Sequence, residues 1–124
     1  MRKHILVIED ENPIQKLLVD IFEEASYSVQ TARFGKEVIL KAKSYRPDAI
    51  LLDLKLPDIH GNEVLKELGK DEELRDIPVV VLSQFTKTLE KTPQVKAVID
   101  KPFDIVDLLD TIEDGLTLNR WPLS

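Results

Sequence analysis

The 124-residue sequence contains no cysteine, so disulfide bonds, thiolate zinc sites and a cysteine nucleophile are excluded. It also lacks a long apolar run: the segment Ile5 to Ile8 is too short for a signal peptide, and no stretch could span a bilayer. Basic charge is scarce as well, since 17 basic residues face 23 acidic ones. The net charge of −6 argues against direct nucleic-acid binding or an anionic-membrane surface. We therefore expect a soluble, cytoplasmic protein.

The composition that remains is typical of one globular domain. Hydrophobic residues make up 43% of the chain and charged residues 32%, which is enough apolar material for a core and argues against disorder. A chain of this length suits a single domain, and no repeat, linker or low-complexity segment interrupts it. We place the domain at residues 1–116 and an irregular tail at residues 117–124.

Strand-like and helix-like segments alternate along the chain. Apolar runs predict five strands, at His4 to Glu9, Ser28 to Ala32, Asp48 to Asp53, Ile77 to Leu82 and Val95 to Ile99. Such alternation is typical of βαβ units, which give a doubly wound parallel sheet with right-handed crossovers. The sequence therefore predicts an α/β fold.

Helical spacing of apolar residues identifies the connecting segments. The first helix carries a stripe from Ile14 to Ala25, with Asn12 as its expected cap, and a second runs from about Lys36 to Ser44. A third begins after Gly61, and a last helix follows Asp104 as its cap. Between Ser83 and Val95 there is room for only a short helix.

Asp53 is the most informative residue. It ends the apolar run Ala49 to Leu52, which is typical of a strand buried on both faces, and a Pro/Gly loop follows it. Ligands of open parallel sheets bind at this carboxyl edge. A charge beside such a core is costly unless a partner group pairs with it.

The first strand ends in a second acidic group, Glu9-Asp10-Glu11. If the first and third strands are neighbours, Glu9 and Asp10 converge with Asp53, and the repulsion between like charges calls for a cation. Oxygen ligands of this kind suit Mg²⁺. Equally, residues 9–11 could form a solvated acidic turn that caps the first helix.

The fourth and fifth strands add a hydroxyl and an ammonium to the same edge. Ser83 ends the fourth strand, and Lys101 follows the fifth and precedes Pro102. Alone, each is ordinary, because serine often begins a turn and lysine is usually solvated. Together with Asp53 and a divalent cation, they form a coherent site for an anionic group attached to that carboxylate.

These motifs resemble the receiver domains of two-component response regulators, from Lys3 to about Gly115. The resemblance rests on four segments in order, Ile5 to Glu11, Pro47 to Gly61, Ile77 to Ser83, and Lys101-Pro102-Phe103. It implies a flavodoxin-like, five-stranded sheet of order 2-1-3-4-5 with about five helices. The chain is similar to the stand-alone type, without a DNA-binding or enzymatic output domain.

The resemblance also implies a function for each matched residue. Asp53 would accept a phosphoryl group from a phosphohistidine on a sensor histidine kinase or phosphotransfer protein, and the change would switch binding to a downstream effector protein. Glu9, Asp10 and the backbone carbonyl of Lys55 would hold Mg²⁺ (or Mn²⁺) together with Asp53. Lys101 would pair with the phosphoryl group, and Ser83 would move to hydrogen-bond it. The resemblance thus implies a signalling protein rather than an enzyme that acts on other substrates.

Three departures from the family concern its readout. Lys101 follows Ser83 by 18 positions, which shortens the expected fourth helix by about one turn. Val98 stands where many receivers carry an aromatic residue, and Gln84 stands where a small residue is common. Lys55 and Phe85 occupy positions that tune dephosphorylation in the family, although Lys55 could equally pair with a nearby carboxylate or remain solvated.

Two other functional classes remain open. The shortened fourth helix and Val98 favour a receiver-like interaction module that works independently of phosphorylation. A small enzyme of the aspartyl-phosphatase type would need a second aspartate where Lys55 stands, and a flavin carrier would need a phosphate loop where Glu9-Asp10-Glu11 stands.

His4 and His60 are expected to be structural or exposed. Trp121 could pack on the domain or contact a partner.

Overall fold

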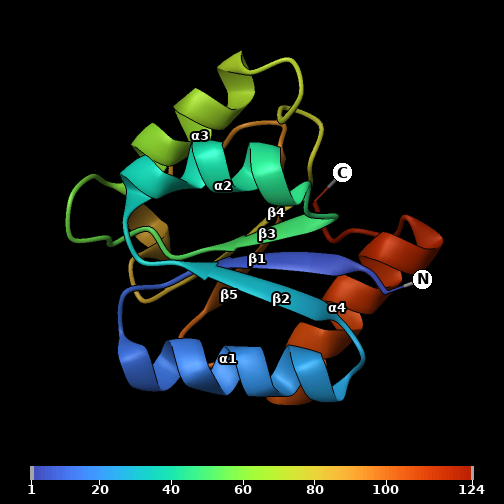
Figure 1. Cartoon of the computed structure of the whole chain (residues 1–124). Helices are drawn as coiled ribbons and strands as arrows, with labels where there is room; N and C mark the ends of the chain where they lie inside the picture. The colour runs from blue at the N-terminus through green and yellow to red at the C-terminus, as the bar shows by residue number, and fades with distance from the viewer. Residues whose placement is uncertain (1, 124) are drawn as a thin grey trace.

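The computed structural model describes residues 2–123, so Met1 and Ser124 at the ends of the expected domain and tail lie outside it. Its centre is a parallel five-stranded sheet of order β2-β1-β3-β4-β5. This confirms the predicted fold class and strand order (Figure 1). The strands are β1 (His4–Ile8), β2 (Ser28–Ala32), β3 (Ala49–Leu52), β4 (Val79–Ser83) and β5 (Val95–Asp100).

Helices cover both faces of this sheet (Figure 1). α1 (Asn12–Glu24) and α4 (Ile105–Leu118) lie on one face, and α2 (Val38–Tyr45) and α3 (Gly61–Lys70) lie on the other. Two short 3₁₀ turns complete the described elements, η1 (Gly35–Glu37) and η2 (Thr86–Thr88). The expected short fourth helix is therefore reduced to η2, and α4 is the last helix that the sequence predicts.

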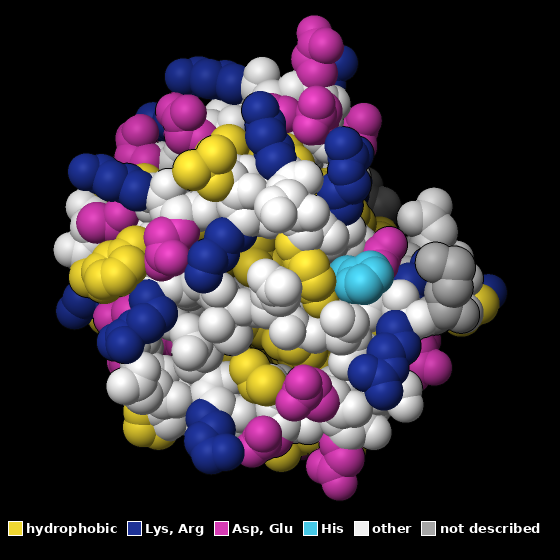
Figure 2. Space-filling view, in the orientation of Figure 1, with side chains coloured by type: hydrophobic (Ala, Val, Ile, Leu, Met, Phe, Trp, Pro, Cys, Tyr) yellow, Lys and Arg dark blue, Asp and Glu magenta, His cyan; other side chains and the backbone are white. Residues whose placement is uncertain are grey.

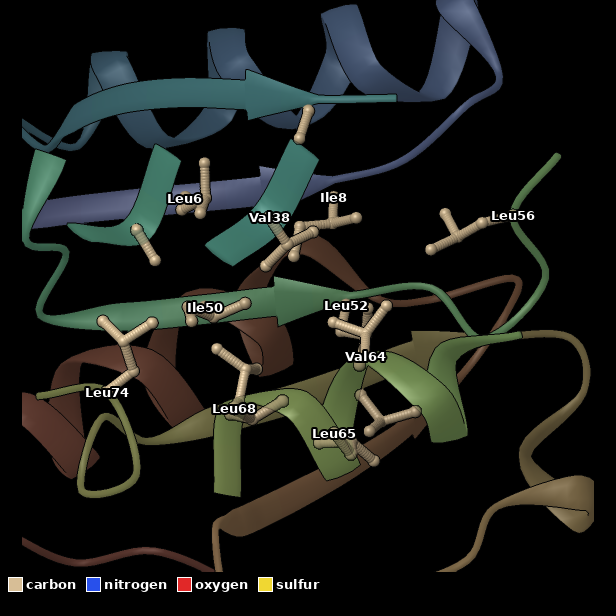
Figure 3. Close-up of a cluster of buried hydrophobic side chains, with 14 of the residues drawn as sticks. Leu6, Ile8, Val38, Ile50, Leu52, Leu56, Val64, Leu65, Leu68 and Leu74 are labelled. Carbon is tan, nitrogen blue, oxygen red and sulfur yellow. The ribbon is translucent and has the colours of Figure 1, made fainter. Parts of the chain in front are cut away.

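Two apolar clusters, one on each face of the sheet, form the core. Because successive strand side chains point to opposite faces, Leu6 and Ile8 of β1 enter the cluster beneath α2 and α3. Figure 3 shows these side chains packed with Ile50, Leu52 and the apolar stripe of α3. Ile5 and Val7 enter the other cluster, against α1 and α4. This double burial explains why the central strands read as continuous apolar runs.

The two expected helix caps have different outcomes. Asp104 caps α4 as predicted, and its side chain accepts a hydrogen bond from the Asp107 N–H at 3.1 Å. The prediction that Asn12 caps α1 is wrong, because Asn12 is already the first helical residue and Glu11 occupies the N-cap position. The helix starts one residue early because the Glu11 carbonyl accepts the first intrahelical bond, from the Gln15 N–H at 2.9 Å.

The segment after α4 folds back onto the domain. Asn119, with φ of 52°, ends the helix in the left-handed conformation. Trp121 then packs against Gly115 and the cluster beneath α4, and the Leu123 N–H donates to the Lys96 carbonyl at 2.9 Å. Of the two alternatives for Trp121, packing on the domain is therefore the one observed. Among the described residues, no helix is long and apolar enough to cross a membrane.

Candidate functional site

The site lies at the carboxyl edge of the sheet, where β1 and β3 end side by side. Their register pairs Ile8 with Leu52, so the residues that follow, Glu9 and Asp53, are neighbours. The Asp53 N–H donates to the Ile8 carbonyl at 3.0 Å, which extends the pairing to the last buried position. The pairing of β1 with β3 thus sets the backbone positions from which the Glu9 and Asp53 side chains extend.

Three carboxylates converge at this edge, as the sequence predicted. One oxygen each of Glu9, Asp10 and Asp53 lies within 4.8 Å of the other two. Glu9 and Asp53 are buried, whereas Asp10 is half-exposed. The alternative of a solvated acidic turn that caps the first helix is therefore wrong for Glu9, whereas Glu11 is exposed at the N-cap of α1. Burial beside other carboxylates favours a cation at this point, and hard oxygen donors of this kind suit a divalent metal ion.

Lys101 follows the edge strand β5 and supplies a positive charge at the same carboxyl edge of the sheet. Its Nζ lies 3.0 Å from Asp53 Oδ2 and also donates to Glu9 Oε1, and its side chain is only 6% exposed. Burial raises the pKa of Glu9 above its ordinary value, against the lowering effect of Lys101. Burial lowers the pKa of Lys101, but hydrogen bonds to Glu9 and Asp53 outweigh it, so the pKa rises and the ammonium stays charged.

Ser83 occupies the buried end of β4 and carries a fully buried hydroxyl. Its Oγ accepts a hydrogen bond from the Phe85 N–H at 3.0 Å, and its carbonyl accepts one from the Lys101 N–H at 3.0 Å. The second bond ties the end of β4 to Lys101, and the Lys101-Pro102 peptide bond that follows is cis. Ser83 therefore lies on the same edge as the carboxylates, as predicted.

A polar cavity of about 210 Å³ opens over these groups. It is lined by Asp10, Glu11, Asp53, Lys55, Gln84, Phe85 and Lys101. At its rim, Lys55 Nζ lies 5.2 Å from the centre of the Phe85 ring, at cation–π distance. The Lys55 N–H donates to Asp53 Oδ1 at 3.3 Å. Among the described residues the Lys55 ammonium forms no ion pair with a carboxylate, and the residue is exposed, so the solvated alternative is the one observed, with the contact to Phe85 in addition.

Sequence reasoning missed the residues that brace the site from outside. Asp58 accepts hydrogen bonds from the Gly35 and Lys36 N–H groups at 2.8 and 3.0 Å, which joins the loop after β3 to η1. Arg33 donates to the Asp10 carbonyl at 3.2 Å. These contacts join segments about twenty residues apart, and no local sequence pattern signals them.

Comparison with known proteins identifies the family. The family model described as the response regulator receiver domain matches residues 5–113, most of the chain. This chain belongs to the receiver-domain family of response regulators. Among curated relatives, the polar-differentiation response regulator DivK of Brucella ovis is 36% identical over 120 residues, covering 94% of this chain and 98% of the relative.

Solved structures agree on the receiver fold. A putative response regulator from Chloroflexus aurantiacus has a TM-score of 0.85 at 21% identity and covers 94% of this receiver domain and 98% of that chain. The receiver domain of the sensor histidine kinase PA1611 from Pseudomonas aeruginosa has a TM-score of 0.84 at 24% identity, with coverage of 94% and 98%. At these identities the likeness concerns the fold.

Proposed function

We propose that this receiver domain accepts a phosphoryl group on Asp53. The observation that carries the proposal is the pairing of Lys101 Nζ with Asp53 Oδ2 at 3.0 Å, beside two further carboxylates and beneath an open polar cavity. An ammonium fixed beside a carboxylate nucleophile is poised to meet an incoming anion.

The acidic cluster is the proposed site of Mg²⁺ or Mn²⁺. The donor set fits such an ion, because Glu9, Asp10 and Asp53 offer carboxylate oxygens within 4.8 Å of one another. The backbone carbonyl of Lys55 is proposed as a further ligand. The PA1611 receiver structure is described with a magnesium ion coordinated in its active-site cleft, which supports the choice of metal. When bound, the ion neutralises charge on the phosphoryl oxygens.

The transfer needs little covalent chemistry from the protein. An Asp53 oxygen forms a bond to phosphorus while the phosphorus–nitrogen bond of a phosphohistidine breaks, and the imidazole nitrogen keeps that electron pair. Lys101 offsets the negative charge on the transferred group. Ser83 turns its hydroxyl to donate to a phosphoryl oxygen, which marks Asp53 as modified. The product, an acyl phosphate, is labile and suits a reversible signal.

This chemistry assigns the protein to signalling rather than to catalysis on other substrates. We propose a histidine kinase or phosphotransfer protein as donor, a downstream effector protein as partner, and the cytoplasm as location. Basic and acidic side chains intermingle over the face seen in Figure 2, and the net charge is −6, which supports a protein partner over direct nucleic-acid or membrane binding.

Phosphotransfer from a purified phosphohistidine-containing donor tests the function. With Mg²⁺ present, label should pass to the wild-type protein and to Asp76→Asn, but not to Asp53→Asn. Asp76 is a matched control because it is an exposed aspartate outside the acidic cluster. Transfer to Asp53→Asn, or no transfer from any donor, would contradict the proposal.

A second candidate is an interaction module that works without phosphorylation. It is favoured by the reduction of the fourth helix to η2 and by Val98, since both alter the usual readout. Partner affinity that is equal for the wild-type protein and Asp53→Asn, with and without a phosphodonor, would support this alternative.

A further inference from the structure

The β4–β5 connection, residues 84–94, lacks the helix that its place in the fold leads one to expect. It contains η2 alone among the described elements, and Val98 of the adjacent strand, which stands where an aromatic residue was expected, is exposed. The connection begins directly after Ser83, so contacts that restrain the connection also restrain the backbone next to Ser83. Residues at the start of α3 make such contacts.

The Asn62 side chain forms two hydrogen bonds with the backbone of the connection. Its side-chain amide donates to the Thr88 carbonyl at 2.9 Å, and its Oδ1 accepts from the Glu90 N–H at 2.9 Å. One side chain thus satisfies a backbone donor and a backbone acceptor 26 to 28 positions away. These bonds restrain a segment that has little other regular structure.

His60 makes the neighbouring contact and ties it to Phe85. Its Nδ1 accepts from the Asn62 N–H at 3.0 Å, and its Nε2 lies 3.1 Å from Thr88 Oγ1. Thr88 Oγ1 in turn donates to the Phe85 carbonyl at 2.7 Å. One neutral tautomer of His60, protonated at Nε2, satisfies all three bonds. We call His60, Asn62, Thr88 and Glu90 the clasp.

The clasp and Ser83 meet at the same residue. The Phe85 carbonyl accepts from Thr88, and the Phe85 N–H donates to Ser83 Oγ at 3.0 Å. A Ser83 hydroxyl that turns toward a phosphoryl group on Asp53 gives up the Phe85 bond, because it has moved away from that N–H. Phe85 then keeps its bonds to Thr88 and its contact with Lys55 but has lost its bond to Ser83.

We propose that His60 and Asn62 are positioning residues that hold the β4–β5 connection in its unphosphorylated arrangement and couple it to Ser83. The inference rests on the proposed phosphorylation of Asp53 and adds the route by which that event reaches the surface. The clasp and the phosphoryl group compete through Phe85: intact, the clasp favours Ser83 bonded to Phe85, and phosphorylation favours the opposite arrangement. By linkage, weakening the clasp must then tighten binding of a phosphoryl group or its mimic.

Calorimetric titration of the protein with beryllofluoride in the presence of Mg²⁺ tests whether a weaker clasp raises the affinity for a phosphoryl mimic. We expect Asn62→Ala to bind the mimic about three- to tenfold more tightly than wild type, as the loss of one or two hydrogen bonds implies. Thr88→Val removes the hydroxyl that joins His60 to the Phe85 carbonyl but keeps the Thr88 N–H bond to that carbonyl, and it should act in the same direction. Glu63→Gln is the matched control, because Glu63 is exposed on the same turn of α3 and contacts Lys66 instead of the connection.

A double-mutant cycle separates coupling from simple loosening of the fold. In a Ser83→Ala background the link to Phe85 is absent, so Asn62→Ala should no longer change the affinity. An equal effect of Asn62→Ala in both backgrounds, or weaker binding by both Asn62→Ala and Thr88→Val, would overturn the inference. Wild-type protein that binds no beryllofluoride would overturn the proposed function and this inference with it. Normal Asp53-dependent binding with an additive cycle would overturn the inference alone.

Discussion

Lys101 shows at the scale of one residue how the site balances its charges. Its ammonium contacts the buried carboxylates of Glu9 and Asp53, and Asp10 adds a third acidic group nearby. When every carboxylate is ionised, the cluster therefore holds two more negative charges than the single ammonium neutralises. Removing the lysine leaves two buried carboxylates without a cationic partner, which is costly.

Lys101→Met should lower the free energy of unfolding by about 3 kcal/mol at neutral pH. The loss should shrink when Mg²⁺ is added, because a cation that binds the folded acidic cluster replaces part of the missing charge. Urea unfolding with and without Mg²⁺ measures both effects. Unchanged stability without metal would show that Lys101 does not neutralise this cluster.

Replacing two glycines of α3 by alanine should change the stability of the fold in opposite directions. A Cβ at Gly61 would lie 2.8 Å from Leu54 Cα and 3.1 Å from the Asp53 carbonyl oxygen, so Gly61→Ala must displace the backbone beside Asp53. We expect a loss of about 1–3 kcal/mol. Gly69, in the same helix, has open space around its Cβ position, so Gly69→Ala should gain up to about 1 kcal/mol. Thermal unfolding of both variants checks the signs.

The residues of the site could be predicted because parallel strands end at one edge. Asp53, Glu9, Asp10, Ser83 and Lys101 each follow or end an apolar run, so the topology alone brings them together. The contact of Lys55 with Phe85 could not be predicted in the same way. It depends on how two loops approach each other, and loop approach leaves no periodic signal in the sequence.

At the scale of elements, Asp58 links the loop after β3 to η1. Burial opposes its ionisation, but the Lys36 and Gly35 N–H groups outweigh this and lower the pKa of Asp58 below its ordinary value of 3.8. Because the folded state holds the proton less tightly than the unfolded state, the carboxylate stabilises the fold above pH 3.8. That stabilisation disappears as the pH falls through the folded-state pKa.

Asp58→Ala should therefore be less stable than wild type near neutral pH, and the difference should narrow below about pH 4. Urea unfolding across this range measures it. Glu72→Ala provides a comparison, because Glu72 is exposed and lies away from this loop. A difference that widens toward acid pH would contradict the assigned hydrogen bonds.

Element prediction succeeded wherever apolar periodicity was strong. All five strands and the four helices appear close to their predicted places, because each has a buried face that sets the spacing. Between Ser83 and Val95 most residues are polar, and Phe85 and Leu89 are too few to define a helical face, so the sequence could limit the length of the helix but not reveal η2. The clasp was equally hidden, since it joins residues 26 to 28 positions apart.

At the scale of the whole molecule, the segment after α4 closes one side of the sheet. Trp121 packs against Gly115 and the cluster beneath α4, while Leu123 bonds the edge strand β5 and packs against the opposite cluster. The segment therefore crosses the edge of β5 and contacts both layers. Trp121 and Leu123 therefore add to the packing on both faces of the sheet.

Trp121→Ala should lower the free energy of unfolding by about 2 kcal/mol, less than for a fully buried aromatic residue because Trp121 is half-exposed. Leu40→Ala, at a position 75% exposed on α2, should change it by less than about 0.5 kcal/mol. Thermal unfolding of the two variants compares them. Equal stability of Trp121→Ala and wild type would mean that this segment does not stabilise the domain.

We propose that Asp53 accepts one phosphoryl group with the help of a metal ion held by the acidic cluster. Intact-mass measurement after incubation with acetyl phosphate tests it most directly, with Mg²⁺ or with a chelator, on the wild-type protein and Asp53→Asn. We expect a single added phosphoryl group on the wild-type protein, present with Mg²⁺ and absent with the chelator or in Asp53→Asn. Modification that persists in Asp53→Asn, or that is indifferent to the metal, would contradict it.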